Sequence, residues 1–336
     1  MTVSIIIAAK RWQKNLEECV RKCGKLDYPD FEIIVLPDVY KPDDAPGLPL
    51  TLGMRIIPTG ALSPPHKRDI GIAHARGDII AFIDDDAYPR HDWLAQACAE
   101  FKDGDTAAVA GPALTPPEDS LRQKASGALF ALWLVSGHVT YRYIPKPRRQ
   151  VRDYPTCNLF VRASVLKEIG GFNTNFWPGE DTLLCLEITE HLHKKIIYSP
   201  AVIVYHHRRP LFLPHLRQVV NYALHRGYFV KRFPQTSRLS LYFVPSIFVT
   251  GLLTLGFLSA VSQEARLWLV VFGAVYINAL LIATMYSVRF LSLTRQRLFD
   301  KALFMLMVFA GIILTHCVYG VSFIKGLVSP ALREEQ

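Results

Sequence analysis

The feature that most constrains the fold is an apolar run that leads straight into three acids, Ile79-Ile80-Ala81-Phe82-Ile83-Asp84-Asp85-Asp86. A short run with β-branched residues, preceded by Gly77-Asp78, is typical of a buried strand in a parallel sheet. The acids follow the C-terminal end of this strand, where open α/β sheets bind their ligands. The stretch therefore predicts an α/β domain with a ligand site at this strand end.

The three acids point in different directions if the chain is extended. Asp84 and Asp86 then lie on one face and Asp85 on the other. Two carboxylates on one face repel each other unless a cation lies between them, and hard divalent metals prefer oxygen ligands. The pattern indicates either a metal site or an exposed acidic loop, and the flanking sequence has to distinguish the two.

Strands and helices alternate through the first half of the chain. We expect strands at residues 3–9, 31–36, 79–83 and 107–111, and helices at residues 13–25 and 66–75. This alternation predicts a parallel, doubly wound sheet. Asp38 and Asp84 would then end neighbouring strands on the ligand side, an arrangement that suits a nucleotide.

Four motifs occur in a fixed order around these elements. They are Tyr28-Pro29-Asp30-Phe31-Glu32-Ile33-Ile34-Val35; residues 66–78 before the acids; Asn158-Leu159-Phe160-Val161-Arg162 with Gly170-Gly171-Phe172 and Gly179-Glu180-Asp181; and Tyr205-His206-His207-Arg208. With these motifs, residues 2–235 resemble the family 2 glycosyltransferases, which have the GT-A fold. The resemblance implies a Rossmann-like domain of class α/β that binds a nucleotide-sugar donor.

The resemblance assigns roles to the three acids and to a histidine. It implies that Asp84 faces the ribose or base of the nucleotide, and that Asp86, together with Asp84, holds Mn²⁺ or Mg²⁺. It favours His206 as a further metal ligand, since a neutral imidazole at a strand end can bind a metal. Asp85 can assist in nucleotide or metal binding, although its position on the opposite face favours a structural role.

Glu180 and Asp181 form the candidate catalytic pair. Pro178-Gly179 interrupts the chain before them and residues 182–188 have a helical pattern, which puts both acids in the first helical turn. Acids at that position are often ordinary helix caps. The resemblance implies instead that Asp181 is the general base for the acceptor hydroxyl, and that direct displacement inverts the anomeric centre.

Other side chains are candidates for donor binding. Arg208 can bind phosphate bidentately or face lipid head groups. Lys67 and Arg68 can reach the nucleotide or remain charges on a helix surface. Asp38 resembles the family's base-contacting acid, although it stands alone where the family usually has two adjacent acids. Trp177 can stack on a sugar ring or pack in the core.

The last hundred residues are strongly apolar. Residues 239–261, 267–288 and 303–324 are each long enough to span a bilayer, which takes roughly 20 apolar residues; buried core helices are the alternative. Basic residues before the first segment and between the second and third place the catalytic domain in the cytoplasm and the C-terminus outside. Lys325 and Arg333, at the C-terminal end, oppose this orientation.

Charge and cysteine usage narrow the choice of partners. The formal net charge is +9, and the basic residues lie beside apolar segments, which favours anionic lipids and phosphate-bearing substrates over nucleic acid. Residues 211–232 predict a basic amphipathic helix at the membrane surface, and residues 120–135 lie in the interface or pack against the sheet. The six scattered cysteines indicate neither a zinc site nor a disulfide framework.

We therefore expect a cytoplasmic GT-A domain at residues 1–210, an interface helix and linker at 211–238, three transmembrane helices within 239–325 and a tail at 326–336. The predicted function is that of a metal-dependent, inverting glycosyltransferase in the inner (cytoplasmic) membrane. Its acceptor would be membrane-associated and polyprenyl-linked, in the assembly of cell-surface glycans. A processive polysaccharide synthase and a non-catalytic membrane scaffold with a GT-A domain are the alternatives.

Overall fold

The computed structural model describes residues 1–41, 53–291 and 298–332. These residues form two compact units, and each unit is built from separate stretches of the chain. The first unit consists of Met1–Leu114 and Tyr141–His207, and the second of Thr115–Thr140 and the described residues from Arg208 onward. The domain boundaries predicted from the sequence are contiguous, whereas these two units are interleaved along the chain.

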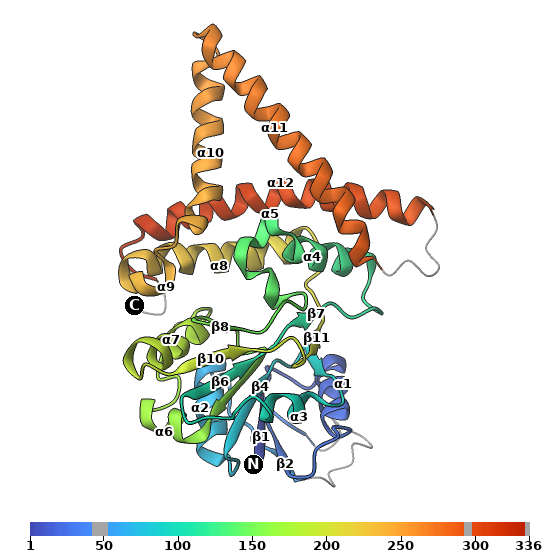
Figure 1. The fold of residues 1–336 in the computed structure, drawn as a ribbon, viewed down its shortest axis with the longest axis vertical. Helices are drawn as coiled ribbons and strands as arrows, with labels where there is room; N and C mark the ends of the chain where they lie inside the picture. Colours follow the sequence, from blue (N-terminus) through green and yellow to red (C-terminus); the bar gives the residue numbers. More distant parts are fainter. Residues whose placement is uncertain (42–52, 292–297, 333–336) are drawn as a thin grey trace. The chain divides into compact units, whose positions relative to one another are not determined.

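The first unit is built on a mixed eight-stranded sheet (Figure 1). Its strands, in spatial order, are β3 (Met54–Ile56), β2 (Phe31–Leu36), β1 (Val3–Ala8), β4 (Ile79–Ile83), β9 (Asn158–Arg162), β6 (Thr106–Ala110), β10 (Lys195–Tyr198) and β8 (Arg149–Val151). A second sheet has the order β5 (Ala87–Pro89), β11 (Val204–His206) and β7 (Ala113–Leu114).

Two predictions about this sheet are wrong in detail. The sheet is not parallel throughout, because β9 runs antiparallel to both β4 and β6, and β8 runs antiparallel to β10. Asp38 and Asp84 do not end neighbouring strands, because β1 pairs with both β2 and β4 and separates them. The strands that carry the acids are parallel, however, so both acids still follow C-terminal strand ends at the same edge.

The helices of the first unit connect these strands. They are α1 (Lys14–Cys23), α2 (Pro64–His74), α3 (Trp93–Cys98), α6 (Ala163–Ile169) and α7 (Glu180–Leu186), which continues as a π-helical turn, Glu187–His191. The expected helix at residues 13–25 is confirmed as α1, whose buried face consists of Leu16, Cys19, Val20 and Cys23. The expected helix at 66–75 is confirmed as α2, although it begins two residues earlier, at Pro64.

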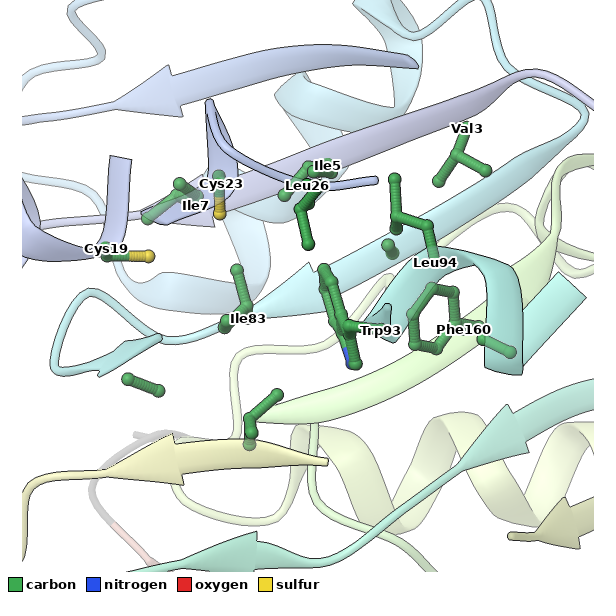
Figure 2. Packing of buried hydrophobic residues seen from close by; sticks show 14 of the residues in the cluster. Val3, Ile5, Ile7, Cys19, Cys23, Leu26, Ile83, Trp93, Leu94 and Phe160 are labelled. Carbon is green, nitrogen blue, oxygen red and sulfur yellow. The ribbon is translucent and has the colours of Figure 1, made fainter. Parts of the chain in front are cut away.

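The core of the first unit lies between α1, α3 and the central strands (Figure 2). Alternate residues of β1, namely Val3, Ile5 and Ile7, are buried together with Trp93 of α3 and Phe160 of β9. β4 is buried at all five positions, Ile79 to Ile83, as the uninterrupted apolar run predicts for a central strand. This central position fixes where the following acids can lie.

The second unit is helical. Its helices are α4 (Leu121–Ala131), α5 (Trp133–Ser136), α8 (Leu213–Arg232), α9 (Pro234–Ser237), α10 (Ser240–Leu258), α11 (Gln263–Ser287) and α12 (Leu298–Val328), with a 3-10 turn at Val288–Phe290. A further 3-10 helix, Gly137–Arg142, contains the chain boundary between the two units, at Thr140. α4 begins at a capping box in which Ser120 and Gln123 exchange hydrogen bonds. Its apolar residues, including Ala125 and Leu129, cluster with Phe304 and Ile312 of α12, so α4 packs on helices of its own unit.

Three helices of the second unit are long and apolar enough to cross a membrane: α10, α11 and α12. They coincide with the three apolar segments expected from the sequence, and the fold class, a GT-A α/β domain followed by candidate membrane helices, is confirmed. α10 and α11 are mostly exposed, whereas α12 is more extensively buried. Exposure of large apolar side chains such as Phe257, Val270 and Ile282 is typical of a lipid-facing surface.

Candidate active site

The acids after β4 meet a histidine from the second sheet. β11 pairs antiparallel with β5, which places His206 opposite Ala87, directly after the acids. The ring Nε2 of His206 lies 3.0 Å from Oδ1 of Asp86. Asp84, Asp86 and His206 each offer one potential ligand atom, and these three atoms lie within 4.8 Å of one another. The structure thus brings together the three residues predicted as metal ligands.

The donor set fits a divalent metal ion. Two carboxylates and one imidazole offer oxygen and nitrogen ligands of the kind that Mn²⁺ accepts, and Mg²⁺ accepts the oxygens. Asp86 is buried, so an ion at this position would offset the repulsion between its carboxylate and that of Asp84. The neighbouring His207 contributes differently, because its backbone N–H donates to the carbonyl oxygen of Asp86 over 2.9 Å and helps to fix the turn.

Asp85 has a different set of contacts from its two neighbours. Its Oδ2 accepts a hydrogen bond of 3.2 Å from Nε2 of Gln13, the residue that precedes α1. This contact is what a position on the opposite face predicts, and it ties the acidic turn to the start of α1. A nucleotide-binding role for Asp85 stays a prediction.

Arg68 joins the acidic turn to the candidate catalytic pair. Its Nη2 lies 3.1 Å from Oδ1 of Asp84, and its Nη1 lies 2.7 Å from Oε1 of Glu180. Burial lowers the pKa of Arg68, but the negative charges of Glu180 and Asp84 outweigh this effect and the pKa is raised overall. Arg68 is therefore a buried, permanently charged bridge, and the prediction that it could be a surface charge is wrong.

Lys67 is also buried, and it holds Asp38. Its ammonium group forms an ion pair with Asp38 and donates to the carbonyl oxygen of Ala9 over 2.5 Å. Nζ also lies 3.4 Å from the carbonyl oxygen of Leu36. Lys67 thus satisfies carbonyls at the ends of β1 and β2 and fixes the side chain of Asp38 there. It is not a surface charge, and its contact with a nucleotide stays a prediction.

Glu180 and Asp181 begin α7, as the sequence predicts. Glu180 is buried, and it pairs with Arg68. Asp181 is half-buried, and its pKa is raised to about 7. Burial of the carboxyl is the main cause, the nearby charges of Glu180 and Asp153 add to it, and Arg142 opposes it. A carboxyl that titrates near neutral pH has the property required of a general base.

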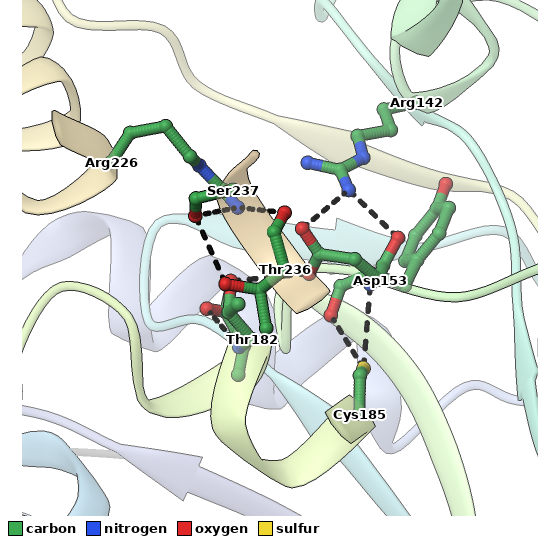
Figure 3. A network of polar contacts seen from close by, with 9 residues as sticks. Arg142, Asp153, Thr182, Cys185, Arg226, Thr236 and Ser237 are labelled. Carbon is green, nitrogen blue, oxygen red and sulfur yellow. Dashed lines mark hydrogen bonds and ion pairs between the residues drawn. The ribbon is translucent and has the colours of Figure 1, made fainter. Parts of the chain in front are cut away.

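A polar network that carries no sequence motif involves Asp153 and Thr182, the residue that follows Asp181 (Figure 3). Asp153 accepts a hydrogen bond of 3.2 Å from the hydroxyl of Thr182, and its Oδ2 lies 3.3 Å from Nη2 of Arg142. Cys185, one turn into α7, accepts from the backbone N–H of Tyr154 over 3.4 Å. Sequence reasoning missed Arg142 and Asp153, because only the tertiary structure places them next to α7.

The loop before α7 is anchored by Asp69 of α2. Oδ1 of Asp69 accepts from the backbone N–H of Phe172 over 2.7 Å, and Oδ2 accepts from that of Asn173 over 3.2 Å. Gly171 has φ +82°, and a Cβ there would lie 2.4 Å from Oδ1 of Asp69. The second glycine of the Gly170-Gly171-Phe172 motif is thus explained by this close approach. The motif holds the start of the segment that leads to Glu180.

Asn158 holds the second sheet in place. Its buried amide donates to the carbonyl oxygens of Gly111, over 2.6 Å, and Val202, over 2.8 Å. Its oxygen accepts from the indole N–H of Trp93 over 2.8 Å. Because Val202 lies two residues before β11, this first residue of the Asn158–Arg162 motif supports the strand that presents His206.

Two other predicted residues remain, Arg208 and Trp177. Arg208 belongs to the second unit, where Nε lies 3.4 Å from the hydroxyl of Thr115 and the backbone N–H donates to Asp119 over 3.3 Å. A phosphate-binding role for Arg208 stays a prediction. Trp177 is 55% exposed, so the alternative that it packs in the core is wrong.

The family model described as Glycosyl transferase family 2 matches residues 4–170, a segment that contains the acidic turn, Arg68 and Asn158. The N-terminal part of the chain belongs to glycosyl transferase family 2. The resemblance inferred from the motifs is thereby confirmed.

Two curated relatives match part of the chain. A pre-mycofactocin glycosyltransferase of Mycobacterium tuberculosis is 29% identical over 147 residues, which are 44% of this chain and 30% of the relative. A glucosyl-dolichyl phosphate glucuronosyltransferase of Haloferax volcanii is 24% identical over 148 residues, 42% of this chain and 46% of the relative. The match spans less than half the length of either relative.

A solved structure is similar over nearly the whole chain. Mannosyltransferase PcManGT from Pyrobaculum calidifontis, in complex with GDP-Man and Mn²⁺, aligns with a TM-score of 0.61 at 17% identity. The alignment covers 98% of this chain and 88% of the mannosyltransferase. At this identity the likeness shows the fold, which includes a GT-A domain and C-terminal helices.

Proposed function

We propose that this protein is a metal-dependent, inverting glycosyltransferase that moves a sugar from a nucleoside-diphosphate donor to a lipid-linked acceptor at a membrane surface. The observation that carries the proposal is the bridge made by Arg68 between Asp84 and Glu180. It links the acidic turn, where a donor diphosphate and metal would bind, to the acids at the start of α7. A scaffold that had lost its chemistry would have no need of this buried, charged connection.

A divalent ion fits the proposed site. Asp84, Asp86 and His206 would hold it, and Mn²⁺ matches this donor set because it takes both carboxylate and imidazole ligands. When bound, such an ion supplies Lewis acidity toward the departing diphosphate. Asp38, Lys67, Asp85 and Arg208 are the remaining residues that we assign to the nucleotide part of the donor.

Asp181 is the proposed general base. Its raised pKa, about 7, lets the ionised carboxylate accept the proton of an acceptor hydroxyl near neutral pH. Glu180 holds Arg68 and keeps negative charge next to Asp181, which contributes to the raised pKa. One base and one direct displacement suffice for transfer with inversion.

The acceptor is proposed to be a polyprenyl-linked sugar or phosphate. The Haloferax volcanii relative is named for a dolichyl phosphate-linked acceptor, and the present chain has three apolar helices that fit a bilayer. The proposed location is the inner (cytoplasmic) membrane, with the catalytic unit in the cytoplasm, because basic residues flank the apolar helices on that side.

Release of nucleoside diphosphate by the purified full-length protein tests the proposal. Detergent-solubilised protein is incubated with UDP-, GDP- or dTDP-sugars and a polyprenyl-phosphate acceptor, with and without Mn²⁺. We expect release from one donor that depends on the metal and is lost in Asp181→Asn. A control variant, Asp105→Asn, replaces an exposed acid of the first unit and should retain activity.

Binding measurements decide the meaning of a negative result. Metal-dependent binding of a nucleotide without turnover would point to a different acceptor. If neither nucleotide nor Mn²⁺ binds, the enzymatic proposal is wrong and a scaffold role remains.

A further inference from the structure

α8 and α12 pack side by side along most of the length of α8 (Figure 1). Near the start of α8, Nε2 of His215 lies 3.1 Å from the hydroxyl of Thr315. At its end, Lys231 donates to the backbone carbonyl of Ser329, directly after α12. The residue numbers on the two helices increase together from one contact to the other, so the helices run parallel.

Two glycines allow the backbones of these helices to touch. A Cβ on Gly227 would lie 2.1 Å from the carbonyl oxygen of Phe323, and one on Gly326 would lie 2.0 Å from that of Leu224. Glycines at both contacts let the two helices approach more closely than larger side chains permit. The pair is therefore a tightly packed unit, and both helices must have nearly the same inclination to a membrane.

α8 is not suited to cross a bilayer. It contains Arg217, Arg226, Lys231 and Arg232, and three of these residues, Arg217, Lys231 and Arg232, are exposed. Charged side chains are costly inside the hydrocarbon region, and a basic amphipathic helix is typical of the interface plane. Because α12 runs parallel to α8 in close contact, a spanning α12 would carry these charges into the bilayer.

α10 and α11 behave differently from α12. The buried residues of α10 are Ser246 and Val249, both in its first half, and residues 250–254 and 256–258 are exposed. Three of the four buried residues of α11, namely Leu280, Thr284 and Ser287, lie in its last third. The two helices form a hairpin with an exposed apolar tip, and Figure 1 shows α12 across its base instead of alongside it.

The contacts of α12 agree with this arrangement. Pro245 and Ser246 of α10 meet α12 at Gly320, where the hydroxyl of Ser246 donates to the Gly320 carbonyl over 3.0 Å. Tyr276 of α11 meets α12 at His316, with 3.0 Å between the hydroxyl and Nδ1. α12 thus contacts the end of α10 that enters the hairpin and the half of α11 that leaves it.

We propose that only α10 and α11 cross the bilayer, and that α12 lies with α8 in the membrane interface. The C-terminus is then on the same side of the membrane as the catalytic unit. The partner of α12 is the lipid interface, which covers its exposed apolar side chains, including Leu306, Val321 and Val328. By length and composition alone α12 could be a span, but its packing against a charged helix is inconsistent with a transmembrane position.

The distribution of charge supports two crossings. With two spans, all the basic clusters fall on one side: Lys231, Arg232 and Arg238 before α10; Arg289, Arg295, Arg297 and Lys301 after α11; and Lys325 and Arg333 at the end. The connection on the other side has only Glu264 and Arg266 nearby. With three spans, Lys325 and Arg333 would lie on the outer side, against the positive-inside rule. With two spans they lie on the same side as the other basic residues, in agreement with the rule.

Cysteine labelling of the full-length protein in intact bacterial cells tests this topology. Three variants each add one cysteine: Val261→Cys between α10 and α11, where the side chain is 81% exposed; Ser292→Cys after α11; and a cysteine appended after Gln336. A membrane-impermeant maleimide is applied before or after permeabilisation. The unaltered chain, with its six native cysteines, gives the background.

We expect Val261→Cys to react in intact cells, and the other two added cysteines to react only after permeabilisation. A C-terminal cysteine that reacts in intact cells would overturn the proposal, because α12 would then cross the bilayer. Reaction of Ser292→Cys in intact cells would also overturn it, because the chain after α11 would then lie outside instead of in the cytoplasm. The outcome does not depend on enzymatic activity, so it stands or falls separately from the proposed function.

Discussion

The carboxyl of Asp181 keeps its proton to a pH at which an ordinary aspartate is ionised. Burial is the main reason, and the charges of Glu180 and Asp153 add to it. If Asp181 is the general base, only its ionised form is active. The pH at which this residue titrates should therefore appear in the kinetics of transfer.

We predict that kcat/KM rises with pH and reaches half of its plateau near pH 7. The carboxyl becomes ionised as the pH rises through its pKa of about 7, and activity is lost as the pH falls below that value. The measurement is donor turnover between pH 5.5 and 9 at saturating metal. A profile that is flat across this range would argue against Asp181 as the base.

The same pKa shift predicts an effect on stability. The folded protein holds a proton on Asp181 at pH values where the unfolded chain has released it, so this residue makes the protein less stable as the pH rises from about 4 to about 7. Asp181→Asn lacks this loss. The quantity to measure is the Tm of Asp181→Asn minus the Tm of the unaltered protein. We expect this difference to be larger at pH 8 than at pH 5.

Alanine substitutions at two adjacent glycines can distinguish the effect of backbone strain from the effect of a specific side-chain contact. Gly170 and Gly171 have φ of +79° and +82°, so alanine is strained at either position. A Cβ on Gly170 would meet open space, whereas one on Gly171 would collide with Asp69. We predict that Gly171→Ala lowers the free energy of unfolding by about 1–3 kcal/mol more than Gly170→Ala, measured by thermal or denaturant unfolding. Equal effects would mean that the Asp69 contact contributes nothing.

Among the elements, α2 organises the site. Its consecutive residues Lys67, Arg68 and Asp69 contact three different parts of the first unit, because successive side chains on a helix point in directions about 100° apart. Lys67 holds Asp38, Arg68 joins Asp84 to Glu180, and Asp69 anchors the loop at Phe172. A short charged stretch thus connects strand ends, a helix start and a loop that are far apart in the sequence.

Removing the cation from the centre of α2 should be costly. We predict that Arg68→Met destabilises the protein by about 3–5 kcal/mol, because Glu180 is left buried without its positive partner. The matched control is Arg21→Met, which removes an exposed ion pair with Glu17 on α1 and should cost at most about 1 kcal/mol. Thermal unfolding of both variants checks the prediction, and similar losses would contradict it.

At the scale of the whole molecule, the chain combines an α/β unit with a helical unit that exposes apolar surface. The exposed apolar surfaces of α10 and α11, which are long enough to cross a membrane, give a direct expectation. We predict that the full-length protein stays in the membrane pellet after alkaline carbonate extraction, while a peripheral protein of the host is released. Its release into the supernatant would exclude integral membrane insertion by the α10–α11 hairpin.

The sequence by itself determined the main chemical features of the protein. The apolar run of β4 and the acids after it are adjacent in the chain, as are Glu180 and Asp181 at the start of α7, so local pattern and helix geometry suffice to locate them. The apolar segments are likewise recognised from composition, because a membrane imposes a length on each span. The order of four motifs then indicated the family.

Only the tertiary structure decided how these parts meet. The antiparallel direction of β9, the position of β1 between β2 and β4, and the grouping of α4 with α12 depend on pairings between residues far apart in the sequence. The bridge made by Arg68 and the charges around Asp181 have no local signature for the same reason. The packing of α12 along α8 also cannot be predicted from composition. By length and composition α12 qualifies as a membrane span, and only its contact with the charged helix α8 indicates a position in the interface.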